Sequence, residues 1–270
     1  MSVGLIYVAT GKQQYIDEAC VSASSLKEQM PNLHITLFSD KTITANCFDE
    51  CRSMASSGSG FLDKILGMQQ SPYDYTLFLD TDTYICGDFS ELFTLLEKYD
   101  VGAVLNEHRT GKFADFCWDY QHMKDDKDRL IYPIYNSGVI LYKESPATTQ
   151  FFIDWFNLTK QRWMDGKILE DQTSFQYALY QSDLKTVVLP PEYNCRLGYP
   201  NSVCGTVKII HGRPRYKTLA EIDREINQET DPRFFHPEWG LIPDSTIQAL
   251  KKIVKETIKR KLNSIGYKKV

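Results

Sequence analysis

Short apolar runs rich in β-branched and aromatic residues alternate along the chain with segments of helical period. The strands predicted from these runs are 3–9, 35–39, 75–79, 101–105, 137–142, 186–189 and 207–210. The predicted helices are 14–30, 60–69, 90–99, 148–163 and 170–180. This alternation favours an α/β fold, in which a mostly parallel central sheet is flanked by helices. Ligands bind such sheets beyond the carboxyl ends of their strands.

Three segments fall outside this alternation. Residues 112–129 combine Asp, Lys and aromatic residues without a clear period, so we expect a surface excursion over the sheet. Residues 227–243 turn to Pro, Asp, Phe and Trp, which predicts a wrapping loop. We therefore divide the chain into a large α/β domain, residues 1–245, and an amphipathic C-terminal helix, residues 246–270. The apolar stripe of this helix consists of Ile247, Leu250, Val254, Ile258, Leu262 and Ile265.

Charge separates the same two parts. The chain has a net charge of −4, but its last 25 residues hold seven Lys, one Arg and one Glu, a net charge of +7 that leaves −11 on residues 1–245. With a net negative charge, the chain as a whole is no nucleic-acid binder built on a positive field. The C-terminal helix either packs on the domain with a solvated basic face or attaches peripherally to anionic lipid.

Cysteine usage and the N-terminus indicate a cytoplasmic protein, peripheral at the inner face of a membrane if the helix binds lipid. The seven cysteines form no CxxC pair, which fits reduced thiols. Cys47 and Cys51 are predicted to be buried thiols on one helix face rather than zinc ligands. The N-terminus lacks the pattern of an export signal, and no apolar run is long enough to span a membrane.

The strongest chemical signal is the pair Asp80 and Asp82, which directly follows the predicted buried strand 75–79. Two carboxylates on a turn leaving a strand can share one crevice and bind a hard divalent cation. The alternative is a polar turn, since Asp is common in turns. The same spacing occurs at Asp126 and Asp128, but there no strand precedes it.

Two chemistries use such a pair. In a phosphohydrolase of the haloacid dehalogenase type, Asp80 would be the nucleophile and Asp82 the general acid beside Mg²⁺. That fold also needs an acidic pair at the end of a later strand, and no downstream predicted strand ends in one. In a glycosyltransferase, the metal bridges the diphosphate of a nucleotide-sugar donor. A noncatalytic sugar-nucleotide-binding protein is a third alternative.

Further motifs follow in order along the chain: IYVATGKQQY near the N-terminus, LFLDTDTY around the aspartates, then YNSGV, EDQ and VKIIHG. Together they resemble glycosyltransferase family 8, metal-dependent enzymes of the GT-A fold that include bacterial lipopolysaccharide galactosyl- and glucosyltransferases and glycogenin-like enzymes. The resemblance runs, with gaps, from Leu5 to Lys217. It implies a UDP-hexose donor, a glycan, lipid-linked or protein acceptor, and transfer with retention of configuration.

The resemblance also implies a role for each matching residue. The metal ligands for Mn²⁺ or Mg²⁺ would be Asp80, Asp82 and His211. The nucleotide would contact Ala9, Thr10, Tyr15, Lys64, Asp80 and Lys217. The donor sugar would contact Asn136, Ser137, Asp171 and Gln172, and Asn136, Asp171 and Gln172 are the catalytic candidates. Each residue taken alone also has a plain structural interpretation, such as a turn, a helix start or a solvated lysine.

One departure and one ambiguity remain in this interpretation. After His211 the chain reads Gly-Arg-Pro-Arg-Tyr-Lys, so Arg213, Arg215 or Lys217 could reach the diphosphate, with Lys217 favoured by its spacing. An inverting enzyme would need a carboxylate as general base. The unplaced acids for that role are Glu107, Asp115 and Asp119.

Overall fold

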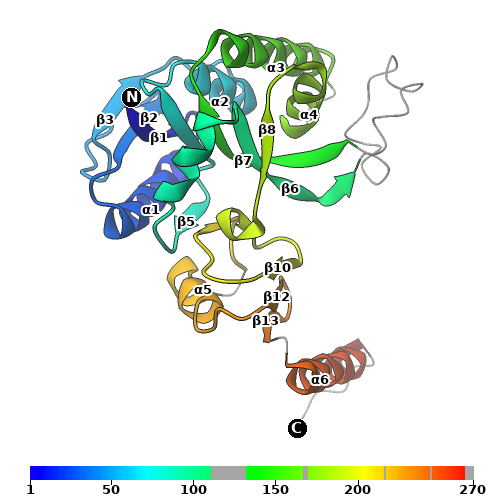
Figure 1. Cartoon of the computed structure of the whole chain (residues 1–270). Helices are drawn as coiled ribbons and strands as arrows, with labels where there is room; N and C mark the ends of the chain where they lie inside the picture. Colours follow the sequence, from blue (N-terminus) through cyan, green and yellow to red (C-terminus); the bar gives the residue numbers. More distant parts are fainter. Residues whose placement is uncertain (111–131, 167–169, 216, 244, 265–270) are drawn as a thin grey trace.

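A computed structural model describes residues 1–110, 132–166, 170–215, 217–243 and 245–264. Its core is a seven-stranded sheet in the order β3-β2-β1-β4-β7-β6-β8 (Figure 1). Neighbouring strands are parallel except that β7 runs antiparallel to both β4 and β6. The strands are β1 (Val3–Ala9), β2 (His34–Ser39), β3 (Glu50–Ser53), β4 (Tyr75–Leu79), β6 (Val101–Thr110), β7 (Pro133–Lys143) and β8 (Thr186–Leu189).

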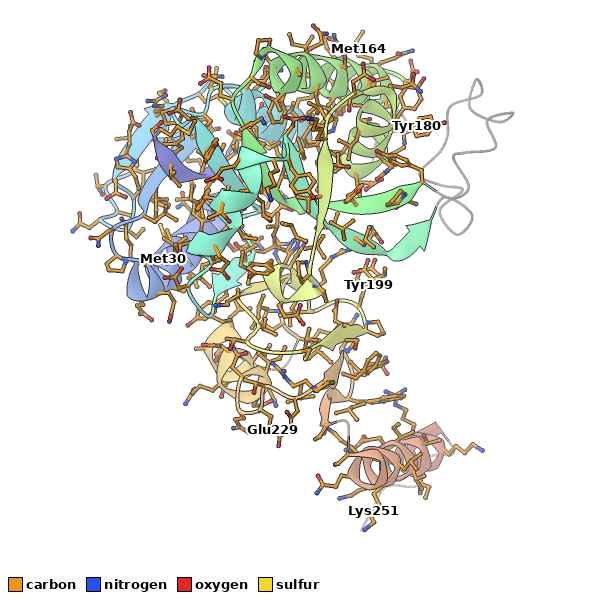
Figure 2. The ribbon with its side chains drawn as sticks, viewed as in Figure 1. Met30, Met164, Tyr180, Tyr199, Glu229 and Lys251 are labelled. Carbon is orange, nitrogen blue, oxygen red and sulfur yellow. The ribbon has the colours of Figure 1, made fainter. Side chains whose placement is uncertain are left out.

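Helices cover both faces of this sheet, so its central strands are apolar on both sides. On β1 the side chains alternate: Leu5 and Tyr7 pack with α1 (Gln13–Gln29) and the 3₁₀ helix η1 (Ser90–Glu97), whereas Ile6 packs with the opposite layer. That opposite layer consists of α2 (Gly60–Gln69), α3 (Pro146–Met164) and α4 (Gln172–Gln181). Side chains fill the space between sheet and helices (Figure 2).

A smaller unit, formed by β5 and by the chain after β8, lies below the carboxyl edge of the main sheet in Figure 1. One of its sheets has the order β5-β11-β9 and the other the order β10-β12-β13. Their strands are β5 (Thr83–Ile85), β9 (Cys195–Arg196), β10 (Asn201–Val203), β11 (Ile209–His211), β12 (Arg233–His236) and β13 (Gly240–Pro243), and α5 (Leu219–Ile226) packs beside them. This unit carries β11, and with it His211, to the edge of the main sheet.

The structure corrects several predictions. Residues 227–243 are not a wrapping loop, since they contain β12 and β13. The strand predicted at 207–210 begins two residues later and belongs to the small sheet, and the helix predicted at 90–99 is a 3₁₀ helix. Cys47 and Cys51 do not share a helix, because residues 50–53 pair with β2 as strand β3. Parallel pairing with a buried neighbour outweighs the weak local helical pattern there.

The last helix of the described chain, α6 (Thr246–Ser264), contacts β13 and lies at the end of the molecule opposite the main sheet (Figure 1). Lys252 donates to the carbonyl of Leu241, and Arg260 lies over the ring of Trp239 and pairs with Glu238. None of the described helices is both long and apolar enough to cross a membrane. The predicted excursion at 112–129 lies outside the described residues, and the division at residue 245 stays a prediction.

Candidate active site

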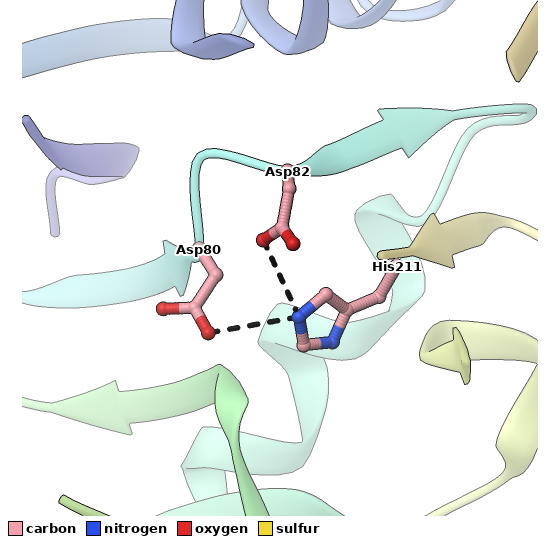
Figure 3. A group of neighbouring side chains, drawn as sticks. All are labelled: Asp80, Asp82 and His211. Carbon is pink, nitrogen blue, oxygen red and sulfur yellow. Dashed lines mark ion pairs between the residues drawn. The ribbon is translucent and has the colours of Figure 1, made fainter. Parts of the chain in front are cut away.

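Strand pairing brings the predicted metal ligands together. Asp80 directly follows β4, Asp82 lies in the turn before β5, and His211 is the last residue of β11. Because β11 runs antiparallel to β5 with His211 opposite Thr83, its imidazole reaches back to both carboxylates. The Nε2 atom of His211 lies 3.6 Å from Asp80 Oδ2 and 3.6 Å from Asp82 Oδ1 (Figure 3). The three side chains thus form one cluster.

The chemistry of this cluster fits a divalent cation. One ligand atom from each of Asp80, Asp82 and His211 lies within 4.8 Å of the others. Burial would raise the pKa of Asp82, but His211 and Arg213 lower it to about 2, so this carboxylate is ionised at neutral pH. Burial raises the pKa of Asp80, and Lys64 and His211 only partly oppose it. Two carboxylates and one imidazole are ligands that suit Mn²⁺, and Mg²⁺ also accepts carboxylate oxygens.

A glycine on β7 makes room for the cluster. A Cβ atom built on Gly138 would lie 2.2 Å from His211 Cε1 and 2.7 Å from Asp80 Oδ2. The carbonyl of Gly138 also accepts a 2.8 Å hydrogen bond from the backbone of Asp80. No side chain fits at this position, which gives the glycine of the YNSGV motif a physical reason.

Lys64 joins the metal-site candidates to the predicted sugar-binding residues. It reaches from α2 across the end of the sheet, and its ammonium group lies 3.1 Å from Asp80 Oδ1 and 3.1 Å from Asp171 Oδ2. Its side chain is only 9% exposed, so it is not a solvated helix lysine. Burial would lower the pKa of Lys64, but Asp171 and Asp80 raise it. Ser137 contacts the same ammonium group at 3.4 Å.

The remaining sugar-facing candidates lie in a buried network of amides. Asn136, on β7, donates to Gln172 at the first turn of α4, with a separation of 3.0 Å. Asn136 also accepts a 2.8 Å hydrogen bond from Asn194, which in turn lies 2.8 Å from His211 Nδ1. Asn194 follows a short 3₁₀ turn, and nothing in its local sequence marks it as functional. We did not predict it.

The metal-site candidates border a cleft of about 590 Å³ at the carboxyl ends of β1 and β4, whereas Asn136, Ser137 and Gln172 do not line it. Seven of the residues to which the resemblance assigns a role line it: Thr10, Tyr15, Lys64, Asp80, Asp82, Asp171 and His211. Ala9, the last residue of β1, is fully buried beside it. The far wall is formed by Ser56 and Gly58 of the loop before α2 and by Gly60 and Phe61 of its first turn. Sequence reasoning missed this wall, although a Ser/Gly run before a helix is a known signal for anion binding.

Buried Asp63 shapes that loop. Its carboxylate accepts hydrogen bonds from Thr10 Oγ1 at 2.7 Å, from Ser56 Oγ at 2.9 Å and from the backbone of Ser57 at 2.7 Å. The end of β1 and the loop before α2 are thereby held at a fixed distance across the cleft. The sequence offers no signal for Asp63 beyond its place on the apolar face of α2.

The three predicted phosphate cations separate in the structure. Arg213 lines the cleft, where its guanidinium binds both carboxylate oxygens of Glu18 at 2.6 and 2.7 Å and lies 3.2 Å from Asp82 Oδ2. Lys217 instead pairs with Glu225 and lines a separate cavity together with Arg215. Of the unplaced acids, Glu107 pairs with Arg196 at 2.7 Å, and Asp115 and Asp119 lie outside the described residues.

Comparison with known proteins agrees with this geometry. The model of the family described as "Glycosyl transferase family 8" matches residues 64–217, more than half of the chain. No curated protein matches the chain in sequence. Among solved structures, the glycosyltransferase GlyE of Streptococcus pneumoniae TIGR4 is similar with 16% identity and a TM-score of 0.56, over 84% of this chain and 61% of GlyE.

The galactosyltransferase LgtC, solved with donor and acceptor sugar analogues, is similar with 12% identity and a TM-score of 0.54, over 83% of this chain and 94% of LgtC. Mouse xyloside xylosyltransferase 1 is similar with 16% identity and a TM-score of 0.50, over 79% of this chain and 98% of that one. The chain spans 61% of GlyE and 40% of the bifunctional WbbM. At such identities these likenesses show a shared fold.

Proposed function

This chain belongs to glycosyl transferase family 8, and we propose that it transfers a hexose from UDP-hexose to a hydroxyl group of a glycan, lipid-linked or protein acceptor. The observation that carries the proposal is the juxtaposition of His211 with Asp80 and Asp82 at the floor of the cleft. A cation held there would face the space in which a nucleotide diphosphate fits.

The walls of the cleft suit the parts of such a donor. Thr10 and the ring of Tyr15, next to β1, offer a surface for the uracil. Gly60 and Phe61, in the first turn of α2, line the cleft, and the N-terminus of a helix favours negative charge. Arg213 adds a guanidinium close to Asp82. Asp80, Asp82 and His211 would hold the Mn²⁺ or Mg²⁺ ion, which supplies charge stabilisation for the departing diphosphate.

The hexose end of the donor lies toward α4 in this proposal. Asp171 and Gln172 begin that helix, and Lys64 and Asn136 hold them beside the metal-site candidates. Buried carboxylate and amide groups can orient sugar hydroxyls and stabilise positive charge that develops on the ring. We expect transfer with retention, in which the acceptor hydroxyl approaches from the side on which the diphosphate leaves.

The phosphohydrolase alternative fits the geometry less well. A nucleophilic Asp80 would have to be free to attack a phosphorus atom, but Lys64 holds one of its oxygens and His211 lies beside the other. Among the described residues, one cluster has the ligand spacing of a metal site. It consists of Asp80, Asp82 and His211 and contains no third carboxylate. An imidazole ligand is part of the glycosyltransferase prediction and not of the phosphohydrolase one.

The surface of helix α6 favours a lipid-linked acceptor. Its exposed apolar and basic surface suits peripheral contact with an anionic membrane, which would place the enzyme beside a lipid-linked acceptor. A cytoplasmic location at the inner face of a membrane is consistent with this contact.

Calorimetric titration tests the central proposal. UDP, GDP and inorganic phosphate are titrated into the protein with and without Mn²⁺. We expect metal-dependent binding of UDP, weakened at least tenfold by Asp82→Asn and unchanged by Asp154→Asn, an exposed aspartate on α3. Metal-independent UDP binding, or hydrolysis of a generic phosphomonoester that Asp80→Asn abolishes, would contradict the proposal. Slow hydrolysis of UDP-hexose without acceptor distinguishes an enzyme from a binding protein.

A further inference from the structure

A continuous line of hydrogen bonds connects His211 to the start of α4. The Nδ1 atom of His211 lies 2.8 Å from Asn194 Oδ1, Asn194 Nδ2 lies 2.8 Å from Asn136 Oδ1, and Asn136 Nδ2 lies 3.0 Å from Gln172 Oε1. All these side chains are buried, and Asn194 is only 1% exposed. Bulk water therefore does not compete for these bonds.

One backbone group fixes the direction of the whole line. The N–H of Gly138 can only donate, and it lies 3.0 Å from one side-chain atom of Asn136, which must therefore be the carbonyl oxygen Oδ1. The same oxygen faces Asn194, so Asn194 must present its NH₂ group there. The other end of the Asn136 amide is then its NH₂ group, and the Gln172 atom that it meets must be the carbonyl oxygen.

The orientation of these amides has a consequence at each end of the line, at His211 and at Gln172. Asn194 has only its carbonyl oxygen left for His211, so the neutral imidazole carries its proton on Nδ1. The unprotonated Nε2 atom then faces Asp80 and Asp82, as a metal ligand must. At the other end, the carbonyl oxygen of Gln172 accepts the hydrogen bond from Asn136, so the NH₂ group of Gln172 remains as a donor.

We propose that Asn194 is a positioning residue that holds His211 in the Nδ1–H tautomer for a metal ion and, through Asn136, turns the NH₂ group of Gln172 toward a hydroxyl oxygen of the donor sugar. Metal-binding histidines commonly donate their second ring nitrogen to a fixed acceptor, and loss of that acceptor weakens metal binding about 10- to 100-fold. The part of this proposal that concerns Gln172 rests on the proposed function. The part that concerns His211 rests on the hydrogen bonds alone.

The tautomer can be read directly by NMR. Long-range ¹H–¹⁵N correlation of the metal-free, ¹⁵N-labelled full chain, at a pH where His211 is neutral, distinguishes a protonated Nδ1 from a protonated Nε2. The signals are assigned with a His211→Gln variant. We expect the proton on Nδ1 in the wild type. A proton on Nε2 overturns the proposal, and this measurement needs no substituted Asn194.

Variants of Asn194 test the two ends separately. Asn194→Leu keeps the shape but removes the acceptor, so we expect His211 to lose its single tautomer and the affinity for Mn²⁺ alone to fall about 10- to 100-fold. Asn194→Asp keeps an acceptor for His211 but sets an oxygen against Asn136 Oδ1. We expect the Nδ1–H tautomer to persist in this variant, while the affinity for UDP-hexose falls more than the affinity for UDP.

A matched control separates positioning from stability. Asn201 also makes side-chain hydrogen bonds in the small unit, to the carbonyls of Arg196 and Tyr199, but it has no bond to the line. Asn201→Leu is expected to lower stability and leave the His211 tautomer and Mn²⁺ affinity unchanged. Unchanged tautomer and Mn²⁺ affinity in folded Asn194→Leu would overturn the proposal. Failure to bind any UDP-sugar, with the tautomer results as expected, would instead refute the proposed donor.

Discussion

At the scale of single residues, the candidate site depends on a position without a side chain. Gly138 lies where β7 passes the metal-site cluster, and its backbone is in contact with Asp80. A methyl group there would overlap the imidazole of His211 and a carboxylate oxygen of Asp80. Protein interiors are close-packed, so such an overlap is relieved only by moving one of the groups.

Gly138→Ala is therefore expected to displace His211 from the cluster. Overpacking of this kind costs about 1–3 kcal/mol of unfolding free energy, which urea unfolding measures. We also expect the affinity for Mn²⁺, measured by titration, to fall by at least tenfold. Gly198→Ala is the matched control, because a Cβ there meets nothing within 4 Å. Normal Mn²⁺ binding by Gly138→Ala would show that the cluster accommodates a methyl group at this position, and would contradict this prediction.

At the scale of elements, a single carboxylate joins the end of α1 to the start of β2. Asp49 accepts a 2.6 Å hydrogen bond from Lys27, in the last turn of α1, and a 2.8 Å bond from the backbone of Ile35 on β2. Burial would raise the pKa of Asp49, but these two donors lower it below its usual range. The ionised carboxylate therefore stabilises this junction.

The sign of the pH dependence follows. Because the pKa is lower in the folded than in the unfolded chain, this stabilisation is complete well above the unfolded pKa of about 3.9 and is lost as the pH falls through the folded pKa. Asp49→Asn should thus lower the unfolding free energy by about 1 kcal/mol at pH 7 and by less as the pH approaches 3. Urea unfolding across this range measures the difference. If the unfolding free energies of Asp49→Asn and the wild type differed by the same amount at every pH, the ionised carboxylate would make no contribution.

At the scale of the whole molecule, α6 presents an apolar stripe that the described residues leave uncovered. Leu250, Val254 and Ile258 are 57%, 54% and 54% exposed and line one shallow groove together with Lys251 and Lys255. Figure 2 shows Lys251 on the side of α6 that faces away from the rest of the molecule. Lys252 and Arg260 contact the small unit instead, which fixes the helix with its stripe outward.

Vesicle sedimentation tests this surface. We expect the full chain to sediment with vesicles that contain phosphatidylserine, and less with neutral vesicles or at high salt, because each basic residue near an anionic surface contributes about 1 kcal/mol. Replacing Leu250, Val254 and Ile258 by Ser should reduce binding at least tenfold. The control replaces exposed Val21 on α1 by Ser. Equal sedimentation of the triple variant and the wild type would refute the membrane contact.

Elements with a strong local pattern could be predicted from the sequence alone. The buried strands before Asp80 and after Val101, the helices α1 to α4 and the position of His211 at a strand end all follow from hydrophobic period and length. Together with the resemblance to glycosyltransferase family 8, these elements are enough to name Asp80, Asp82 and His211 as metal-site candidates. The resemblance also points to Lys64, but not to the burial of Lys64 between two carboxylates.

Features that depend on pairing between distant segments emerge only in the folded chain. Strand β5 is too short for a recognisable period, and no local pattern sets its antiparallel register with β11, which places His211 beside the aspartates. The hairpin of β12 and β13, the contact of Gly138 with the cluster and the hydrogen bonds of Asn194 are likewise absent from any local pattern. Local propensity acts over a few residues, whereas strand register and buried hydrogen bonds are set by packing of the whole chain.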